Sequence, residues 1–584
     1  MFLIFDTETT GLPKKWNAPI SDTDNWPRCV QIAWQLHDDF GALIEHQDFL
    51  IKPEDFNIPF DAEKIHGIST QLAEEKGYSL EKVLHLFNEA LSKCKFVVGQ
   101  NVNFDLNIMG CEFIRKEIQT NLNQLPVLDT CTETTASLCQ IPGGRGGKFK
   151  LPTLTELHEH LFHAPFSEAH NATADVEATT RCFFELIRQR VFTKEELNAS
   201  SDYFQHFDAK NPSTINVIGL KHINLKKESK KLSLKTTDNS EDDIVHSKEV
   251  ISDFKSAQFA HLHCHSQFSI LQSTSSVGNL VNAAIKNNMP AVALTDSGNM
   301  MGAFYFIREA LNYNEVVDKH NKNLKDGEIP KSIIKPILGC EFNVCEDHTD
   351  KNNKDNGYQI VILAKNKNGY HNLAKMSSIS HTDGFYYVPR IDKKVIEAHK
   401  EDLIILSGNL YGEIPSKILN VGENQAEEAL IWWKEQFGNN FYLELMRHSQ
   451  ENENHVNSVL IEFSKKHNVK LIASNNTFYT TKDEAEAHDI LLCVKDGEKV
   501  ATPKGRGRGY RFGLPNNEYY FKSQEQMKSL FEDVPEAITN IQEIVDKIEI
   551  YTLVRDVLLP KFNIPKEFAN PEDSIDGGVR GENA

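Results

Sequence analysis

Acidic residues near the start of the chain are spaced so that several of them could share a metal ion. Asp6 and Glu8 lie in residues 2–11, FLIFDTETTG, an apolar segment that predicts a strand ending in a turn. The two-residue step places both carboxylates on one face of that strand. Like charges this close raise each other's pKa, so a divalent cation is their natural partner. Because exposed strands often carry such a pair, the pair alone is weak support for a metal site.

Two further acids and a histidine follow at suggestive positions. Asp105 comes shortly after the apolar strand predicted at 96–99, where α/β sheets commonly present ligand groups. His170 lies in the loop before a predicted helix over 176–190, and Asp175 lies in the first turn of that helix. Each has an ordinary alternative, since an acid at a helix N-terminus interacts favourably with the helix dipole. The order and spacing of the whole set, rather than any single residue, predict a carboxylate metal site.

This set of residues resembles the DEDDh exonucleases, a family that includes the proofreading subunit of bacterial DNA polymerase III. The resemblance implies an RNase H-like, mixed-sheet domain that removes nucleotides from the 3′ end of DNA. It further implies two Mg²⁺ or Mn²⁺ ions about 4 Å apart that clamp the phosphodiester. The implied ligands are Asp6, Glu8, Asp105 and Asp175, and the implied general base is His170.

The resemblance extends over residues 1 to about 190 and has two supporting matches. One is the segment 66–68, HGI, and the other is the pair Asp129-Thr130 after a strand. Asp129 fits the N-cap of a helix as well as it fits a site residue.

Two other functions remain open for the first domain. Related nucleases with the same acids degrade RNA, and the acids alone do not distinguish the sugar. A scaffold without catalytic activity is the second alternative, and the complete set of four acids and a histidine argues against it.

The chain alternates apolar runs with helical periodicity in two regions, which predicts two α/β domains. In the second region this alternation predicts a (β/α) barrel. The strands predicted there are 291–295, 359–363, 403–407, 441–445 and 471–474.

A second possible metal cluster begins at residues 260–266, AHLHCHS, where His261, His263 and His265 stand at strand spacing. This region resembles the polymerase and histidinol phosphatase (PHP) domain that opens bacterial DNA polymerase III alpha subunits. The matching segments include 268–271, 289–299, 337–341, 363–373, 407–410, 442–445, 487–493 and 559–562.

The resemblance also implies that the PHP metal site is incomplete. His263, His265 and Glu341 are present, and they form a possible residual site. The usual ligands at other positions are replaced by side chains that bind metals poorly. We therefore expect a scaffold rather than a hydrolase, and zinc binding is doubtful. The replacements are Ser297, Gln359, Asn409, Asn476 and Phe478.

These segments predict four parts in the chain. The expected boundaries are 1–192 for the exonuclease domain, 193–257 for a linker, 258–565 for the PHP domain and 566–584 for the start of a truncated polymerase region. In the linker, lysines at 226, 227, 230 and 231 are followed by acids at 241–243. Because opposite charges follow at once, a solvated tether is favoured over a DNA contact.

Residues 504–511, KGRGRGYR, form a glycine-rich loop with four positive side chains. Flexible backbone and positive charge suit phosphate contact, and they equally suit a mobile surface loop. Arg506 and Arg508 are therefore candidate DNA contacts.

Composition limits the class of protein. The 584 residues carry a net charge of −20, so any nucleic acid must be gripped by local basic patches or partner subunits. The ten cysteines show no paired spacing, which argues against a disulfide framework and a zinc knot. No apolar run is long enough to span a membrane, so we expect a cytoplasmic protein. The resemblances imply the primer 3′ end and replisome subunits such as the sliding clamp as partners, although no clamp-binding peptide is evident.

Overall fold

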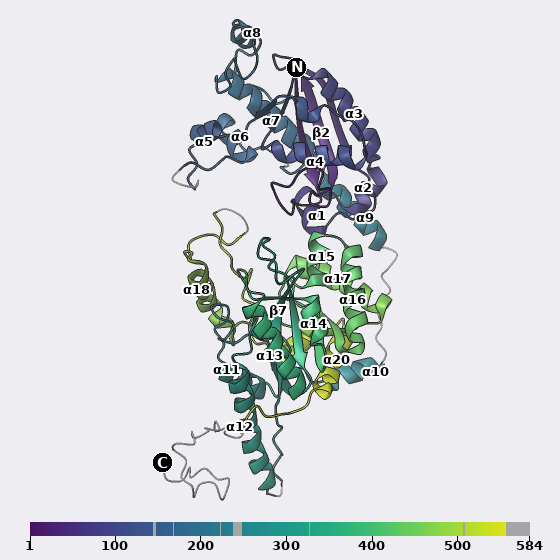
Figure 1. Cartoon of the computed structure of the whole chain (residues 1–584), viewed down its shortest axis with the longest axis vertical. Helices are drawn as coiled ribbons and strands as arrows, with labels where there is room; N and C mark the ends of the chain where they lie inside the picture. The colour runs from purple at the N-terminus through teal and green to yellow at the C-terminus, as the bar shows by residue number, and fades with distance from the viewer. Residues whose placement is uncertain are drawn as a thin grey trace, which may run out of the picture.

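The computed structural model describes residues 1–143, 148–166, 169–221, 223–237, 248–325, 327–505 and 509–555. Two α/β bodies are stacked along the long axis of the molecule (Figure 1). The first contains the N-terminal sheet, and the second contains the strands from residue 291 onward.

The first domain is built on a five-stranded mixed sheet in the order β3-β2-β1-β4-β5. The central strand β1 pairs antiparallel with β2 and parallel with β4. This confirms the mixed α/β domain predicted from the sequence. The strands are β1 (Phe2–Thr9), β2 (Cys29–His37), β3 (Leu43–Leu50), β4 (Phe96–Gly99) and β5 (Val127–Asp129).

Helices cover both faces of this sheet because alternate residues of β1 point to opposite sides. Leu3 and Phe5 pack with α3 and α4, whereas Phe2 and Ile4 pack with α6 and α7. The helices of this domain are α1 (Phe60–His66), α2 (Thr70–Lys76), α3 (Leu80–Lys93), α4 (Asn103–Arg115), α5 (Glu133–Cys139), α6 (Leu154–Phe162) and α7 (Ala172–Arg188), with a 3-10 turn at Leu122–Gln124.

The segment 193–257, predicted as a solvated linker, contains three helices among its described residues. These are α8 (Tyr203–Lys210), α9 (Leu225–Thr237) and α10 (Lys248–Ser256). Tyr203 and Phe207 on α8 are buried in the first domain's core, and so are Leu225 and Leu232 on α9. Their spacings of four and seven residues put each pair on one helix face, a weak apolar signal beside the many charges.

The second domain is a ring of strands in the order β12-β11-β10-β8-β7-β6, with β9 paired to β7. Residues 261–265 close the ring, since Ala293 N donates to His261 O at 2.8 Å and Thr477 N to His263 O at 3.2 Å. Unlike an all-parallel barrel, β8 runs antiparallel to both neighbours. The strands are β6 (Ala291–Leu294), β7 (Lys335–Cys345), β8 (Tyr358–Ala364), β9 (Arg390–Asp392), β10 (Leu403–Leu406), β11 (Phe441–Met446) and β12 (Lys470–Ser474).

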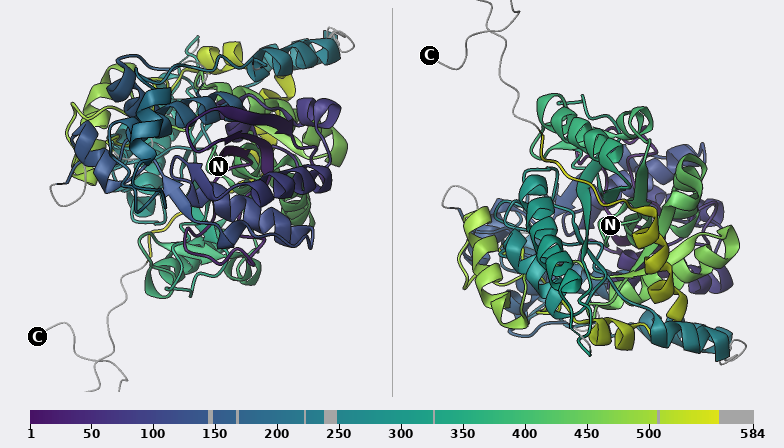
Figure 2. Two further views of the ribbon diagram at one scale, coloured as in Figure 1. Left: turned by 90° about the horizontal axis from the view of Figure 1, so that it is seen from above. Right: turned by 90° about the horizontal axis from the view of Figure 1, so that it is seen from below.

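Helices surround this ring, as the view from below shows (Figure 2). No helix in the described residues is long and apolar enough to cross a membrane. The helices are α11 (Val277–Lys286), α12 (Ala303–Lys322), α13 (Lys367–Thr382), α14 (Lys393–Ala398), α15 (Glu413–Asn420), α16 (Glu423–Phe437), α17 (Glu451–His467), α18 (Ala485–Asp496), α19 (Gln524–Leu530) and α20 (Pro535–Lys547), with 3-10 turns at Gly438–Asn440 and Lys482–Glu484.

The two domains meet where α1 lies against α15 and α17 (Figure 1). The ring of Phe60 stacks on that of His455 with centroids 4.0 Å apart. Beside this stack, Lys64 forms an ion pair with Glu451 at 2.8 Å. The contact combines one ring stack with a surface ion pair, and through it the first domain lies against the second.

Candidate active site

Strand β1 presents the first two acids of the predicted site and also anchors a third. Asp6 and Glu8 lie on β1 with Thr7 between them. The backbone N–H of Thr7 donates to Asp105 Oδ1 at 3.0 Å, and its hydroxyl donates to the same oxygen at 2.6 Å. Asp105, in the first turn of α4, is thereby held against the strand that carries the other two acids.

Asp129 positions this arrangement from the end of β5. Its carboxylate accepts the backbone N–H groups of Asn101 at 2.8 Å, Val102 at 3.1 Å and Cys131 at 2.7 Å. Asn101 and Val102 form the turn that leads into α4. The contacts of Asp129 therefore fix the start of the helix that carries Asp105.

The fourth acid and the histidine come from the N-terminus of α7. Asn171 caps this helix by accepting the N–H of Thr173, and Asp175 lies in its first turn. The backbone N–H of His170 donates to Asp175 Oδ2 at 2.9 Å. His170 has a left-handed φ of 68° and an exposed side chain. Ligand atoms of Glu8, His170 and Asp175 all lie within 4.8 Å of one another.

The electrostatics show that these acids are crowded. Burial and the charges of Asp105, Asp175 and Glu8 raise the pKa of Asp6 well above its usual range. Burial likewise raises the pKa of Asp105 and of Asp175 to about 7. Four oxygen-bearing side chains that destabilise one another's charged forms fit hard divalent cations, which would neutralise them.

In the second domain, His263 lies between two buried carboxylates. Its Nε2 is 3.1 Å from Glu341 Oε2, and its Nδ1 is 3.1 Å from Glu444 Oε1. Although burial lowers the pKa of His263, the two carboxylates raise it to about 10. A protonated imidazole therefore supplies positive charge between these carboxylates.

Sequence analysis did not single out Glu444. The one available signal was a glutamate within the apolar strand segment FYLELM. The other histidines of residues 260–266 differ from His263 in their surroundings. Burial lowers the pKa of His265 to about 4, while its Nε2 lies 3.8 Å from Glu341. His261 lies outside the cluster and contacts the carbonyl of Lys522 at 2.9 Å.

The positions that lack metal ligands form a neutral network around Glu341. Ser297 Oγ donates to Glu341 Oε1 at 3.0 Å, and Asn409 Nδ2 donates to Gln359 Oε1 at 2.9 Å. Phe478 stacks on His265 with ring centroids 4.5 Å apart. His263, His265 and Glu341 remain close enough to share an ion. Apart from the Glu444 carboxylate, which contacts His263, the groups named beside them are hydroxyl, amide and phenyl.

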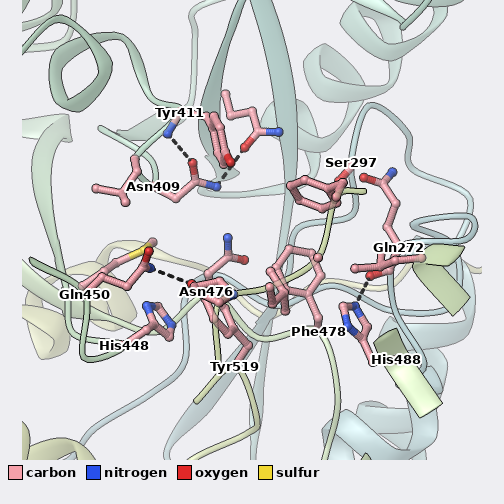
Figure 3. Close-up of a pocket in the computed structure, with 18 of the residues that line it drawn as sticks. Gln272, Ser297, Asn409, Tyr411, His448, Gln450, Asn476, Phe478, His488 and Tyr519 are labelled. Atoms are coloured by element: carbon pink, nitrogen blue, oxygen red, sulfur yellow. Dashed lines mark hydrogen bonds between the residues drawn. The ribbon is translucent and has the colours of Figure 1, made fainter. Parts of the chain in front are cut away.

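Ser297, Glu341 and Gln359 are among the side chains that line a cavity of about 400 Å³ (Figure 3). Asn409, Asn476 and Phe478 face it together with Tyr411, His448 and Tyr519.

The glycine-rich loop offers fewer free charges than its sequence indicates. Lys504 lies 3.0 Å from Asp489, and Arg511, which is buried, lies 2.8 Å from the same carboxylate. Both are therefore already paired. Arg506 and Arg508, the predicted DNA contacts, lie outside the described residues.

Two family profiles match the chain. One, described as Exonuclease, matches residues 3–183, and the other, described as PHP domain, matches residues 261–448. The chain joins an exonuclease domain to a PHP domain. The exonuclease match includes all five predicted site residues, and the PHP match includes His263, His265 and Glu341.

Relatives at the sequence level are DNA polymerase III alpha subunits. The subunit of Borreliella burgdorferi is 37% identical over 317 residues, which are 53% of this chain and 26% of that protein. The subunit of Campylobacter jejuni is 33% identical over 330 residues, or 55% of this chain and 25% of that protein. The exonuclease–PHP chain thus spans about a quarter of the length of these relatives.

Among solved structures, E. coli exonuclease I in complex with a dA16 oligonucleotide is 24% identical, with a TM-score of 0.27. The match covers 34% of this chain and 42% of that one. A TM-score this low supports no conclusion beyond the family match.

The crowded acids predict a stability that falls with pH when metal is removed. The pKa of an unfolded Asp is about 3.9, whereas that of Asp105 in the folded domain is about 7. A carboxyl whose pKa rises on folding in this way stabilises the fold at low pH. It loses this effect as the pH rises through that interval. In EDTA at pH 8, Asp6→Asn is therefore expected to raise the melting temperature of the exonuclease domain by about 2–4 °C, measured by calorimetry. Asp129→Asn is the control. It weakens the three hydrogen bonds that the Asp129 carboxylate accepts from backbone N–H groups, so it should lower that temperature. A decrease for Asp6→Asn would contradict the proposed crowding.

The charge of His263 predicts a large loss of stability when it is removed. His263→Ala leaves Glu341 and Glu444 buried without compensation, which costs about 3–5 kcal/mol in comparable cases. The free energy of unfolding of the PHP domain, measured in urea, should fall by that amount. Gln359→Ala, which removes one neutral hydrogen bond, should cost only about 1 kcal/mol. Stoichiometric zinc in the purified chain, or a PHP domain destabilised by chelators, would contradict this assignment.

Proposed function

We propose that the exonuclease domain removes nucleotides one at a time from the 3′ end of DNA. The observation that carries the proposal is the convergence of four carboxylates and a histidine at the carboxyl end of β1. Asp6 and Glu8 come from β1 itself, Asp105 from α4, and His170 and Asp175 from the start of α7. A ring of acids that raise one another's pKa is suited to binding cations and unsuited to binding a polyanion without them.

The cations that fit this donor set are Mg²⁺ or Mn²⁺. Asp6, Glu8, Asp105 and Asp175 offer only oxygen ligands, which hard divalent ions prefer to the nitrogen and sulfur ligands typical of zinc sites. Two such ions, held by these four residues, would supply Lewis-acid chemistry for phosphodiester hydrolysis. Thr7 and Asp129 keep Asp105 in place for this role through the hydrogen bonds described above.

His170 is the proposed general base. Its exposed side chain lies beside Glu8 and Asp175, where an attacking water would be held. Partial desolvation by the surrounding protein and the charge of Lys226 lower the pKa of His170, so the imidazole is neutral near neutral pH and able to accept a proton. The hydrogen bond from its own backbone N–H to Asp175 fixes its position relative to the acids.

We further propose that this activity proofreads for a DNA polymerase. The sequence relatives are alpha subunits of DNA polymerase III, and the PHP domain is joined to the exonuclease in one chain. Fusion keeps the exonuclease at high effective concentration near the primer end. The neutral network around Glu341 supports a scaffold role for the PHP domain, and other replisome subunits would be its partners.

The first test is digestion of DNA carrying a 3′ mismatch on a primer–template, with and without Mg²⁺ or Mn²⁺. The chain should release nucleotides stepwise from the 3′ end, and Asp6→Ala with Glu8→Ala should abolish release because half of the acid set is lost. Gel analysis of a 5′-labelled primer reports the direction. Degradation of RNA but not DNA would move the assignment to an RNA exonuclease, and no metal-dependent degradation of either would favour a scaffold.

The role of His170 gives a second test. His170→Ala should lose at least about 100-fold in kcat, the usual contribution of general-base catalysis, while Mn²⁺ affinity measured by calorimetric titration stays within about threefold. The four acids that hold the ions are unchanged. His160→Ala, which removes an exposed histidine from α6, is the matched control and should change neither quantity. An equal loss of metal affinity in His170→Ala would show that His170 is a ligand rather than a base.

A further inference from the structure

A segment beyond the exonuclease profile match runs back along α7 toward the candidate site. Arg181 Nε donates to Ile215 O at 2.8 Å. One turn earlier on α7, Glu177 accepts the N–H of Leu220 at 3.2 Å. The strap, defined as residues 215–221 and 223–225, therefore follows the helix from its middle to its N-terminus.

The strap ends next to the loop that carries His170. Asn171 caps α7 and directly follows His170, and its Nδ2 donates to Ile223 O at 3.2 Å. Helix α9 begins two residues later, at Leu225. The start of α9 is thus tied to the same N-terminus that holds Asp175 and His170.

Helix α9 is fixed from its other side by the segment 66–69. Ser229 Oγ donates to Gly67 O at 2.7 Å and accepts the N–H of Ser69 at 3.2 Å. Leu225 and Leu232 are buried in the small core beneath α2. The helix is therefore docked by hydrogen bonds and apolar packing rather than suspended as a tether (Figure 1).

Lys226 is the charged residue that this docking places beside the candidate site. A Cβ on Gly67 would lie 2.4 Å from Lys226 Cγ, and Gly67 has a φ of 79°, so only glycine permits this approach. Burial, with smaller contributions from the charges of His170 and Lys226, lowers the pKa of His66 to about 4. The Lys226 charge also acts on His170.

The Lys226 ammonium is exposed, and it forms no hydrogen bond or ion pair with any residue in the described ranges. Nearby lysines differ, because Lys76 and Lys231 both pair with Glu228, at 2.7 and 2.6 Å. Lys226 is therefore an exposed, unpaired cation on a docked helix, and the start of that helix is tied to the N-terminus of α7, where the proposed base lies.

We propose that Lys226 binds a phosphate of the nucleic-acid strand held in the exonuclease site. The inference rests on the proposed function. A site built from four carboxylates repels a polyanion, and a fixed cation at its edge offsets that repulsion and orients the backbone. Lys226 contacts none of the four acids, so it is a positioning residue that acts on binding rather than on the chemical step.

The test compares Lys226→Ala, Lys226→Arg and Lys227→Ala in the full chain. Lys227 is the matched control, since it is an equally exposed lysine on the same helix that contributes to neither histidine's pKa shift. Affinity for a labelled single-stranded DNA is measured by fluorescence anisotropy over a KCl series in the Asp6→Ala, Glu8→Ala background. Lys226→Ala should weaken binding about fivefold and reduce the log–log salt slope by about 0.7, the value for one phosphate of a single strand. Lys226→Arg and Lys227→Ala should match the parent.

In the chain with its acids intact, Lys226→Ala should raise KM about fivefold and leave kcat within twofold, because the lost contact acts on binding. An unchanged affinity, salt slope and KM, or equal losses in Lys227→Ala, would overturn the phosphate contact alone. Failure of the proposed function is distinct, since then the chain with all its acids and lysines would not degrade DNA in the presence of Mg²⁺ or Mn²⁺.

Discussion

Mutual repulsion among the four carboxylates of the exonuclease domain is the constraint that its surrounding structure must withstand. Asp6 and Glu8 are forced together by their spacing on β1, and burial makes their charged forms more costly still. The neighbouring hydrogen bonds oppose this repulsion, since Thr7 donates twice to Asp105 and the His170 backbone donates to Asp175. The domain thus retains an arrangement that is unfavourable without cations, which is typical of a site organised for metal ions rather than for its own stability.

The PHP domain also buries carboxylates close together, but their charge is compensated in a different way. Glu341 and Glu444 are buried across the inside of its strand ring, and a protonated His263 lies between them. Charge balance there comes from a proton on imidazole, and Ser297 and Asn409 satisfy the remaining oxygens of Glu341. The two sites therefore differ in how their buried carboxylates are compensated. The second supplies its own positive charge through His263, whereas we propose that the first binds cations.

The parts of the fold that the sequence predicted are those in which local pattern and burial agree. Strand β1 begins with the apolar run Phe2–Phe5, and α7 carries both a cap and an apolar face, so both the elements and their acids were predictable. Strand β3 escaped prediction because most of its residues are only partly buried and show no regular alternation of buried and exposed positions. Glu444 escaped because its partner His263 is distant in sequence, and a single acid in an apolar strand does not reveal what lies opposite it.

Helix α9 shows why the charge pattern of the linker segment predicted a solvated tether where the structure has a docked helix. Its lysines and the acids that follow them have the composition of a solvated tether, and only Leu225 and Leu232, seven residues apart, indicate a buried face. Its position is set by two hydrogen bonds between residues distant in sequence. One runs from Ser229 to Gly67 and the other from Asn171 to Ile223. A chain with a net charge of −20 cannot attract a polyanion through its overall field, so the location of each unpaired cation matters more than their number. That location is set by tertiary docking, which composition alone does not encode.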